Sequence, residues 1–480
     1  MTTVVPAADR TRVLERLRAV LGPHGVLQAP ADVDKYLTDF RGLYRGATLL
    51  VACPRDTAQV SQVLRICHEA GVGVVPHGGN TSYCGGATPD ESGRQVVLSL
   101  HRLNRIRAVD PANHSMIAEA GCVLADVQAA ALAAGRHFPL SLGSEGSCQI
   151  GGNLSTNAGG LAAVRYGVAR DLVLGLEVVL ANGDVLHGLS SLRKDNTGYD
   201  LRDLFIGAEG TLGVITAASL KLFPVPRTVE TAFLAVTGMQ AAVDVLARLR
   251  EATGDCVTSF EYLPRIAVEV TTRHVPGVVD PLGEAHPAYV LCEVSTARDD
   301  PQLRPLLESV LQQCLDAGLV LDATLAESIA QRAALWKLRE SVPEAQKHEG
   351  ASIKHDVSVP VASLPAFLER ASAAVARVAP RSRLVAYGHV GDGNLHFNLS
   401  EPAAGDDRAG FLAQQPAINE AVHECVRSFD GSISAEHGIG RLKRDLLPRY
   451  KDPVALETMR ALKRALDPKG ILNPGKVLRD

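Results

Sequence analysis

Two histidines, His389 and His396, lie seven residues apart and flank a turn that is rich in Gly, Asp and Asn. The residues on either side of this turn have strand-like sequences, and the turn chemistry predicts a hairpin. In one straight strand, residues seven apart would point to opposite faces. A turn at residues 391–394 can instead bring the two imidazoles side by side, as two ligands of a metal site.

The segment Ser434–Gly440 supplies the carboxylate that such a site still needs. Glu436 would complete a set of two nitrogens and one oxygen with open positions, which suits Zn²⁺, Mn²⁺ or Fe²⁺, and we favour Zn²⁺. His437 is the candidate general base, because an imidazole titrates near neutral pH. A hydrogen-bonded structural role is as common as a ligand role for a single histidine. The prediction therefore depends on the pair occurring together with Glu436 and His437.

The composition is that of a soluble globular protein. The chain has 480 residues, of which 46% are hydrophobic and 21% charged, and a net charge of −4, so no basic surface for nucleic acid is predicted. No uncharged apolar run reaches the roughly 18 residues of a membrane span, and residues 1–10 lack the apolar core of a secretory signal. Nine cysteines are scattered singly, which predicts reduced thiols in a cytoplasmic protein.

Three glycine-rich blocks occupy the first half of the chain. A helix predicted at 57–70 and a strand predicted at 73–76 lead into the first block, residues 77–86. In α/β domains, a glycine-rich loop that follows a strand in this way often presents its backbone N–H groups to phosphates. The block is, however, neither a Rossmann fingerprint nor a Walker loop. The other blocks cover 139–160 and 196–216. Ordering such glycine-rich blocks costs conformational entropy, and a ligand that accepts many backbone hydrogen bonds would offset this cost. The three blocks therefore predict a cleft for an extended phosphorylated cofactor.

The second half of the chain alternates strands and helices. Pro224–Arg227 is the predicted domain boundary. Beyond it, strands are predicted at 231–236 and 289–293, and helices at 239–253 and 301–317. This pattern predicts an α+β cap domain with an antiparallel sheet.

Two cationic side chains stand near the end of this domain. A helix predicted at 330–347, kinked by Pro343, carries Arg339. In the strand predicted at 353–359, the odd-numbered positions form an apolar face that includes one His, and the even-numbered positions, starting with Lys354, form a polar face. The polar face is expected to line a pocket. Surface salt bridging is the more common role of Arg and Lys.

Together these motifs resemble the vanillyl-alcohol oxidase/p-cresol methylhydroxylase superfamily of flavoproteins. The N-terminal blocks look like its flavin-binding domain, and the C-terminal half looks like the FAD-linked oxidase C-terminal domain of D-2-hydroxyacid dehydrogenases. Matching motifs run from about Val51 to Lys476. The sequences GSCQIGGN at 146–153 and LRKDNTGYDL at 192–201, with the two His motifs, resemble the branch of D-2-hydroxyglutarate dehydrogenases.

The resemblance implies an α+β fold with three segments. Residues 1–226 would form a two-subdomain FAD-binding domain, and residues 227–430 the α+β cap domain that binds substrate. Residues 431–480 would return to the FAD-binding domain and the active site. Within the cap, the polar composition of residues 401–408 separately predicts a loop.

The resemblance also implies where FAD binds. The pyrophosphate is expected at Pro76, Gly78, Gly79, Asn80, Thr81, Gly85 and Gly86. The rest of FAD is expected at Gly143, Ser144, Gly146, Ser147, Gly151, Gly152, Asn157, Gly159, Gly160, Gly213, Val214, Ile215 and Asn473, with Asn473 near the isoalloxazine ring. Relatives that bind FAD covalently carry a His two positions after the first Gly of the first loop. Asn80 stands there, so non-covalent FAD is expected.

The implied reaction is the oxidation of a D-2-hydroxy acid to the 2-oxo acid, with hydride transfer to flavin N5. Arg339 and Lys354 would hold the substrate carboxylate, and Asn398 could orient the hydroxyl or a second carboxylate. D-2-hydroxyglutarate is the expected substrate. In that branch a hydroxyl residue four positions after this Arg helps to bind the acid, but Pro343 stands here and cannot donate a hydrogen bond. A D-lactate or glycolate dehydrogenase is therefore the alternative.

Two further functions stay open on the sequence alone. One is a flavin oxidase of another alcohol that passes electrons to O₂. The other is a non-catalytic flavin- or metal-binding subunit, against which the intact Arg339, Lys354 and His437 argue. The expected partners are a small 2-hydroxy acid and an external electron acceptor, namely an electron-transfer flavoprotein, a quinone or a cytochrome, because no second redox motif is present. A homodimer is also expected.

Overall fold

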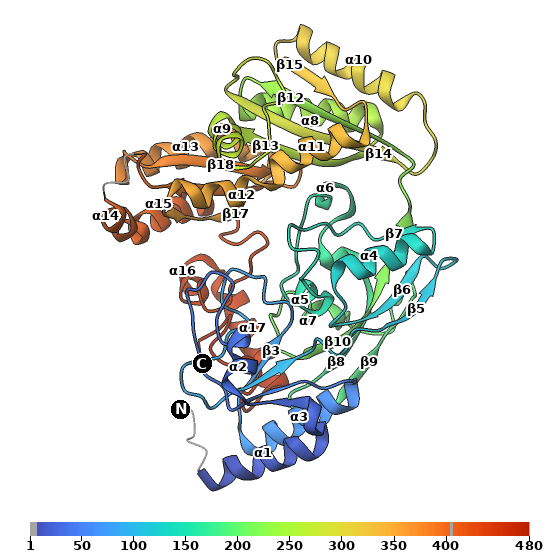
Figure 1. Ribbon diagram of the computed structural model, residues 1–480, viewed down its shortest axis with the longest axis vertical. Coiled ribbons are helices and arrows are strands. Elements are labelled where there is room, and N and C mark those ends of the chain that lie inside the picture. The colour runs from blue at the N-terminus through green and yellow to red at the C-terminus, as the bar shows by residue number, and fades with distance from the viewer. Residues whose placement is uncertain (1–6, 404–406, 480) are drawn as a thin grey trace. The chain divides into compact units, whose positions relative to one another are not determined.

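The computed structural model describes residues 7–403 and 407–479 (Figure 1). Three parts of the chain lie outside the described residues. They are residues 1–6 of the segment in which no secretory signal is predicted, residues 404–406 of the loop predicted at 401–408, and Asp480. The chain divides into two compact units. Unit 1 comprises the residues up to 158, residues 168–225 and residues from 436 onward; unit 2 comprises 159–167 and 226–435. The domain limits expected from the sequence, at 226 and 430, stay a prediction.

Unit 1 begins with a sheet whose strand order is β1-β2-β4-β3. These strands are β1 (Val26–Leu27), β2 (Leu50–Ala52), β4 (Val96–Ser99) and β3 (Val74–His77), with β2 and β3 both parallel to β4. Helices α1 (Ala7–Leu21) and α3 (Thr57–Ala70) pack on each other, and their apolar faces join one core with these strands. The carboxylate of Asp56 caps α3 by accepting from Gln59 N–H at 2.8 Å, and Gly71 ends the helix at φ 66°. The helix predicted at 57–70 is thereby confirmed.

The second sheet of unit 1 is antiparallel, in the order β5-β6-β10-β8-β9. Its strands are β5 (Ile106–Asp110), β6 (Ser115–Glu119), β10 (Val214–Lys221), β8 (Val173–Val179) and β9 (Val185–Gly188). A turn with Gly183 at φ 89° joins β8 to β9, and its Asn182-Gly183 pair is typical of a tight hairpin turn. The remaining α-helices and strands of unit 1 are α2 (Pro30–Val33), α4 (Leu124–Ala133), α5 (Ile150–Ser155), α7 (Arg202–Phe205), α16 (Leu447–Tyr450), α17 (Pro453–Leu466), β7 (Arg136–His137) and β11 (Phe223–Pro224).

The C-terminal tail is bound to the first sheet of unit 1. Leu472 forms a parallel bridge with Val74 in β3, and Asn473 N–H donates to the Val74 carbonyl at 2.8 Å. Lys463 of α17 donates to the carbonyls of Thr211 and Leu472 at 2.9 and 2.8 Å. In Figure 1 the red C-terminal helices accordingly accompany the blue N-terminal elements of the same unit.

In the described part of unit 2, one antiparallel sheet has the strand order β15-β12-β14-β13-β18-β19-β16, and β17 also pairs with β19. Its strands are β12 (Thr228–Val236), β13 (Val257–Pro264), β14 (Ala288–Thr296), β15 (Val320–Leu325), β16 (Ser352–Ile353), β17 (Asp356–Ser358), β18 (Arg383–His389) and β19 (Asn394–Ser400). The α+β class with an antiparallel cap sheet is confirmed.

The helices of unit 2 form two sets. Helices α9 (Arg265–His274), α11 (Ile329–Glu340) and α12 (Val342–Ala345) cover one sheet face through an apolar cluster that includes Leu263, Leu291 and Tyr387. The other set comprises α8 (Met239–Thr253), α10 (Leu303–Asp316), α13 (Leu364–Val378) and α15 (Gln415–Ser428), which are linked by mutual contacts. The short helices α6 (Ala163–Tyr166) and α14 (Arg408–Ala413) complete the described part of unit 2.

The helix predicted at 330–347 is divided rather than kinked. Helix α11 ends at Glu340, and α12 begins at Val342 with Pro343 in its first turn. Proline has no N–H and a fixed φ, so it fits the first turn of a new helix better than the interior of a long one. The single kinked helix expected from the sequence is therefore wrong.

The strand predicted at 353–359 appears as β16 and β17, which share one register against β19. Ile353 lies opposite Leu399 and Asp356 lies opposite His396, so the same register places Lys354 opposite Asn398. The apolar face is buried as predicted, but Asp356 on the polar face is buried as well, with 1% of its surface exposed.

Candidate active site

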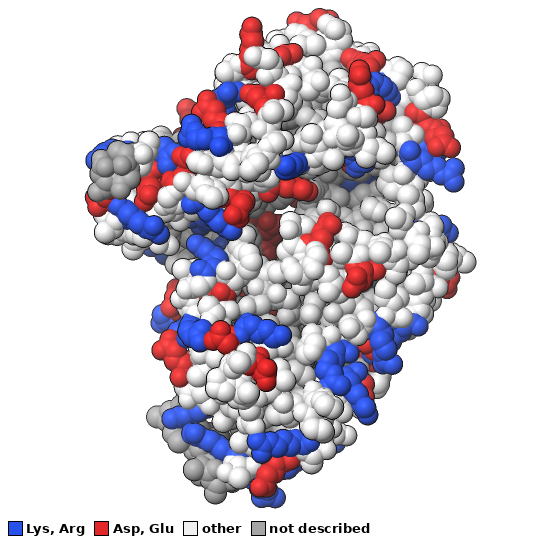
Figure 2. Space-filling model, viewed as in Figure 1, with Lys and Arg blue, Asp and Glu red and all other residues white. Residues whose placement is uncertain are grey.

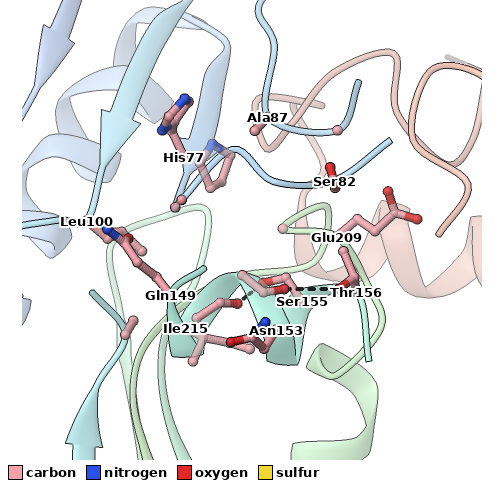
Figure 3. Close-up of a pocket in the computed structure, with 18 of the residues that line it drawn as sticks. His77, Ser82, Ala87, Leu100, Gln149, Asn153, Ser155, Thr156, Glu209 and Ile215 are labelled. Carbon is pink, nitrogen blue, oxygen red and sulfur yellow. Dashed lines mark hydrogen bonds between the residues drawn. The ribbon is translucent and has the colours of Figure 1, made fainter. Parts of the chain in front are cut away.

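A cavity in unit 1 is lined by the glycine-rich loops. It holds about 840 Å³ of space free of protein atoms, including the part that is open to solvent. Its walls come from the loop that follows β3, from α5 and its flanking residues, from the start of β10 and from Asn473 of the tail. Figure 3 shows Gln149 and Glu209 on opposite sides of this cavity, with Ser155 and Thr156 of the α5 segment between them.

The polar lining of this cavity fits a cofactor rich in hydrogen-bonding groups. In the part of the chain that the structure describes, the buried side-chain oxygens of Gln149, Asn153 and Asn473 have no hydrogen-bond partner. Buried polar atoms are normally hydrogen-bonded, so a bound ligand is expected to supply the missing partners. The loops also pack too closely for larger residues, because a Cβ on Gly79 would lie 2.2 Å from the carbonyl oxygen of Ser147.

The structure brings most of the predicted cofactor residues to this cavity. Those that line it are Pro76, Gly78, Gly79, Asn80, Thr81, Gly86, Gly151, Gly152, Gly213, Val214, Ile215 and Asn473. The predicted residues outside its lining are Gly85, Gly143, Ser144, Gly146, Ser147, Asn157, Gly159 and Gly160. Of these, Gly159 and Gly160 belong to unit 2, and Asn157 binds Arg170 N–H at 2.9 Å. The cofactor role of each predicted residue stays a prediction.

Sequence reasoning missed several residues that line the cavity, notably Gln149, Asn153, Thr156 and Glu209. Three of them lie in or beside the GSCQIGGN motif, so the motif marked the region without singling them out. Glu209 has a φ of 51°, which is unusual for a residue other than Gly. Burial raises the pKa of its carboxyl to about 6, although two backbone N–H groups oppose this effect.

The predicted hairpin exists in unit 2 and pairs the two histidines. Strands β18 and β19 are antiparallel, with Tyr387 opposite His396, and the ring centroids of His389 and His396 lie 5.4 Å apart. The turn requires glycine at Gly393, where φ is 86° and a Cβ would lie 2.2 Å from the Val359 carbonyl oxygen. The hairpin and the approach of the imidazoles are confirmed, and their role as metal ligands stays a prediction.

Strand register gathers the polar residues of unit 2 on one sheet face. Directly opposed residues point to the same side of a sheet. The register therefore places Glu261 and His389 of neighbouring strands on one face, which also carries the opposed pairs Asp356–His396 and Lys354–Asn398. We call these six residues the site face. The same face carries the apolar cluster under α9, α11 and α12, so the polar residues extend directly from the packed core.

Glu261 is a buried carboxylate of the site face that the sequence did not reveal. Its side chain is fully buried, accepts from His389 Nδ1 at 2.7 Å and binds Arg339 Nε and Nη2 at 2.7 and 2.6 Å. Burial raises the pKa of Glu261, but the charges of His389 and Arg339 outweigh it and lower the pKa to about 2. With Nδ1–H of His389 donated to this carboxylate, Nε2 is the ring atom that can act as a ligand.

Arg339 is paired inside the protein rather than at its surface. Only 4% of the residue is exposed, and its guanidinium lies 5.0 Å from the centre of the Tyr387 ring. Lys354 is half-buried between β16 and β17. Asn398 is buried, and its amide nitrogen donates to Gln346 Oε1 at 3.0 Å. The three predicted substrate residues thus lie on or over one sheet, within unit 2.

Asp356 adds a second carboxylate beside His396. Their potential ligand atoms lie within 4.8 Å of each other, and Asn394 Nδ2 donates to Asp356 Oδ1 at 2.9 Å. The main chain of Asp356 also contacts the segment that leads to the predicted ligand Glu436, because Ala435 N–H donates to the Asp356 carbonyl at 3.3 Å. The sequence pattern placed Asp356 on the polar face of its strand but did not indicate a role in a metal site.

Glu436 and His437 belong to unit 1, and their side chains have ligand atoms within 4.8 Å of each other. The His437 ring packs edge-on against Tyr83 of the first glycine-rich block, with centroids 4.6 Å apart. The predicted base is thereby held against the same loop that lines the cavity of unit 1.

Basic and acidic side chains are mixed on the face of the molecule that Figure 2 shows. On the face shown in Figure 2, Lys and Arg are interspersed with Asp and Glu in small groups, as expected for a net charge of −4. None of the helices in the described ranges, 7–403 and 407–479, has the length and apolar character required to cross a bilayer.

Comparison with known proteins identifies the family. Residues 48–188 match the FAD binding domain family, and residues 225–477 match the family of FAD linked oxidases, C-terminal domain. D-2-hydroxyglutarate dehydrogenase, mitochondrial, of Bos taurus is 41% identical over 99% of this chain and 84% of its own length. The Arabidopsis thaliana protein of the same name is 38% identical over 96% of this chain and 80% of its own. This chain belongs to the FAD-dependent D-2-hydroxyacid dehydrogenases.

A solved structure agrees with this assignment at the level of the fold. The D-2-hydroxyacid dehydrogenase chain matches p-cresol methylhydroxylase with substrate bound at a TM-score of 0.77 and 17% identity, over 99% of this chain and 98% of the other. The vanillyl-alcohol oxidase/p-cresol methylhydroxylase fold expected from the motifs is confirmed. The dehydrogenase is an enzyme that uses FAD to oxidise a small D-2-hydroxy acid.

The prediction of a cytoplasmic protein is wrong. The relatives from Arabidopsis thaliana and Bos taurus, which match 96% and 99% of this dehydrogenase, are named as mitochondrial proteins. The nine cysteines are free, as predicted. Free cysteines are common to proteins of every reducing compartment, so their presence could not distinguish the cytoplasm from another one.

Proposed function

We propose that this dehydrogenase oxidises D-2-hydroxyglutarate to 2-oxoglutarate, with FAD held non-covalently in the cavity of unit 1. The observation that carries this proposal is the site face, which gathers imidazoles, carboxylates, an amide and an ammonium group on one side of the sheet, with four of the six residues buried. The names of the two relatives support the choice of acid. When bound, FAD supplies the hydride acceptor at flavin N5.

The substrate is held by cations and an amide of unit 2. Arg339 has five N–H donors, and Glu261 binds the edge formed by Nε and Nη2, which fixes the orientation of the guanidinium. Its guanidinium would also bind one substrate carboxylate as a fork, with Lys354 as a point charge. Asn398, opposite Lys354 in the sheet, would orient the hydroxyl or the second carboxylate.

The proposed metal ligands are His389, His396 and Glu436, and we add Asp356 as a fourth candidate. Two facts support this set: Asp356 and His396 have ligand atoms within 4.8 Å, and the residue before Glu436 is hydrogen-bonded to Asp356. Nitrogen and oxygen donors of this kind suit Zn²⁺, which we favour over Mn²⁺ and Fe²⁺. Such a cation would stabilise the alkoxide that develops as the hydroxyl proton leaves.

His437 is the proposed general base. Its imidazole would take the proton of the substrate hydroxyl, and bound FAD would supply the acceptor for the hydride of the carbon that bears this hydroxyl, so that the 2-oxo acid forms. The edge-on contact with Tyr83 restricts the orientation of the ring. The electrons then pass to an external acceptor, for which we propose an electron-transfer flavoprotein, a quinone or a cytochrome. The homodimer expected from the sequence also stays a prediction.

Pro343 favours a second candidate function, a D-lactate or glycolate dehydrogenase. It stands in the first turn of α12, where the hydroxyglutarate pattern has a hydroxyl. Dye-linked turnover of D-2-hydroxyglutarate, D-lactate and glycolate separates the candidates, and peroxide measured in the same assay tests for an oxidase. The proposal predicts that kcat/KM is highest for the diacid and that little peroxide forms. A preference for D-lactate would contradict the choice of acid.

We predict that acid precipitation of the yellow protein releases its flavin into the supernatant. Asn80, at the position of the tethering His, donates its amide to the Thr38 carbonyl at 2.8 Å and has no ring nitrogen for a covalent link. The measurement is the flavin absorbance of pellet and supernatant. Flavin that stays with the denatured chain would contradict non-covalent binding.

We predict that Lys354→Met raises KM for D-2-hydroxyglutarate by about 10–100-fold, because a charge-assisted hydrogen bond contributes about 1.5–3 kcal/mol. Arg339→Ala should raise KM as well, but it also removes one of the two cationic partners of the buried Glu261, and breaking a buried ion pair typically lowers stability by about 3–5 kcal/mol. Steady-state kinetics and melting temperatures measure both effects. Lys337→Met is the matched control, because this lysine of α11 is exposed and donates to the Pro276 carbonyl at 3.0 Å. An unchanged KM in Lys354→Met would exclude its contact with the carboxylate.

A further inference from the structure

The Glu209 carboxylate binds the turn that follows the proposed base. Its two oxygens accept from the backbone N–H groups of Ile439 and Gly440, at 2.7 and 2.8 Å. Ile439 is two residues after His437. Only 8% of Glu209 is exposed, so both bonds are shielded from water. Charge-assisted bonds to consecutive backbone donors are strong and fix the path of the chain.

The main chain of Glu209 is part of the cavity wall. Its N–H donates to the Ser155 carbonyl at 2.8 Å, and its carbonyl accepts from Asn473 Nδ2 at 2.8 Å. Its φ of 51° is a strained value that persists only where surrounding contacts fix the backbone. Figure 3 shows the side chain leaving this wall and extending away from Asn153 and Ser155. Glu209 therefore links the cavity wall, through its main chain, to the turn after His437, through its carboxylate.

The glycines of the turn allow it to lie close against this wall. Gly438 has φ 76°, and a Cβ there would lie 2.9 Å from Glu209 Oε1. Gly440 has φ 49°, and a Cβ there would lie 2.2 Å from the Cys84 carbonyl oxygen. The positive φ values and the close approach both require glycine. The sequence Glu436–Gly440 is thus shaped by its packing on Glu209 and Cys84.

We propose that Glu209 is a positioning residue that clamps this turn and so holds His437 at a fixed place beside the flavin cavity. The proposal deepens the proposed function, since it rests on His437 as the base. Glu209 need not touch the substrate. Its carboxylate fixes the backbone after His437, its main chain belongs to the cavity, and the contact with Tyr83 fixes the ring.

Hydrogen exchange tests the clamp without any reference to activity. In Glu209→Gln, one amide oxygen can accept only one of the two bonds, and the NH₂ group faces the other donor. The amides of Ile439 and Gly440 should then exchange at least 10-fold faster than in the wild-type protein with FAD bound. Glu457→Gln, at an exposed position on α17, is the matched control and should leave this exchange unchanged. Unchanged exchange in Glu209→Gln would overturn the clamp.

A double-mutant cycle tests whether the clamp serves the reaction. Glu209→Gln and Gly438→Ala, each at saturating FAD, should lower kcat by about 10–100-fold with little change in KM, because a small misplacement of a catalytic group has effects of this size. The double variant should be no slower than the worse single one, since both disturb one contact. If Glu209→Gln reaches the wild-type kcat once FAD is saturating, or Gly438→Ala is as fast as wild type, Glu209 is only part of the cavity wall.

The two tests separate this inference from the proposed function. Faster exchange in a protein whose wild type does not oxidise D-2-hydroxy acids would refute the function and leave the clamp intact. Wild-type turnover with unchanged kcat in both variants would refute the positioning role alone. Melting temperatures show whether Glu209→Gln is folded, and Gly438→Ala provides the independent variant if it is not.

Discussion

His437→Ala is expected to lower kcat for D-2-hydroxyglutarate by about 10²–10⁴-fold and to leave KM nearly unchanged, because a general base acts only as the proton leaves. The ring is half-buried and contacts Tyr83, so its removal should affect stability far less than rate. Steady-state kinetics and the melting temperature of the variant measure the two effects.

Added imidazole provides a control for this variant. A small base that enters the space left by the side chain should restore part of kcat in His437→Ala and have no effect on the wild type. A variant that retains more than about a tenth of the wild-type kcat would place the base elsewhere, since general-base loss is rarely so mild.

Loss of the metal site is expected to have an equally large effect. His396→Ala, Glu436→Ala and chelator treatment should each lower kcat by at least about 10³-fold, which corresponds to about 4 kcal/mol of lost transition-state stabilisation. FAD should stay bound, because neither His396 nor Glu436 is among the residues that line the cavity proposed for it. Elemental analysis and the flavin spectrum of the same sample measure both.

His355 offers a matched control within the same sheet. Its Nδ1 binds the Phe397 carbonyl and its Nε2 binds Asn419, both at 2.9 Å, which identifies it as a structural histidine. His355→Asn should lower the melting temperature and leave the metal content at the wild-type level. Full activity of metal-free His396→Ala would contradict the metal site.

The sequence predicted correctly those helices and turns that are determined by residues close to each other in the chain, such as helix caps and turn residues. The bounds of α3 follow from the Asp56 cap and from Gly71, and α8 spans 239–253 as predicted because Gly254 ends it in the left-handed conformation at φ 61°. The turn chemistry at 391–394 likewise sufficed to predict that His389 and His396 approach each other. These features depend on residues within a few positions of each other.

The residues that the sequence missed depend on distant partners. Glu261 is separated from His389 by 128 positions and meets it only because β13 pairs with β18. Glu209 is 230 positions from Ile439, and nothing in its immediate sequence indicates that contact. The division of the 330–347 helix was missed for a different reason: Pro343 is compatible with either a kink or a new first turn, and tertiary packing decides between them.

Anaerobic titration of the oxidised protein with D-2-hydroxyglutarate, followed by the flavin absorbance, tests the proposed oxidation without an external acceptor. About one equivalent of the D acid should bleach the flavin, L-2-hydroxyglutarate should not, and chelator-treated protein should be bleached far more slowly although its flavin remains bound. A flavin that stays oxidised in the presence of the D acid, or that both enantiomers reduce equally fast, would refute the proposed oxidation.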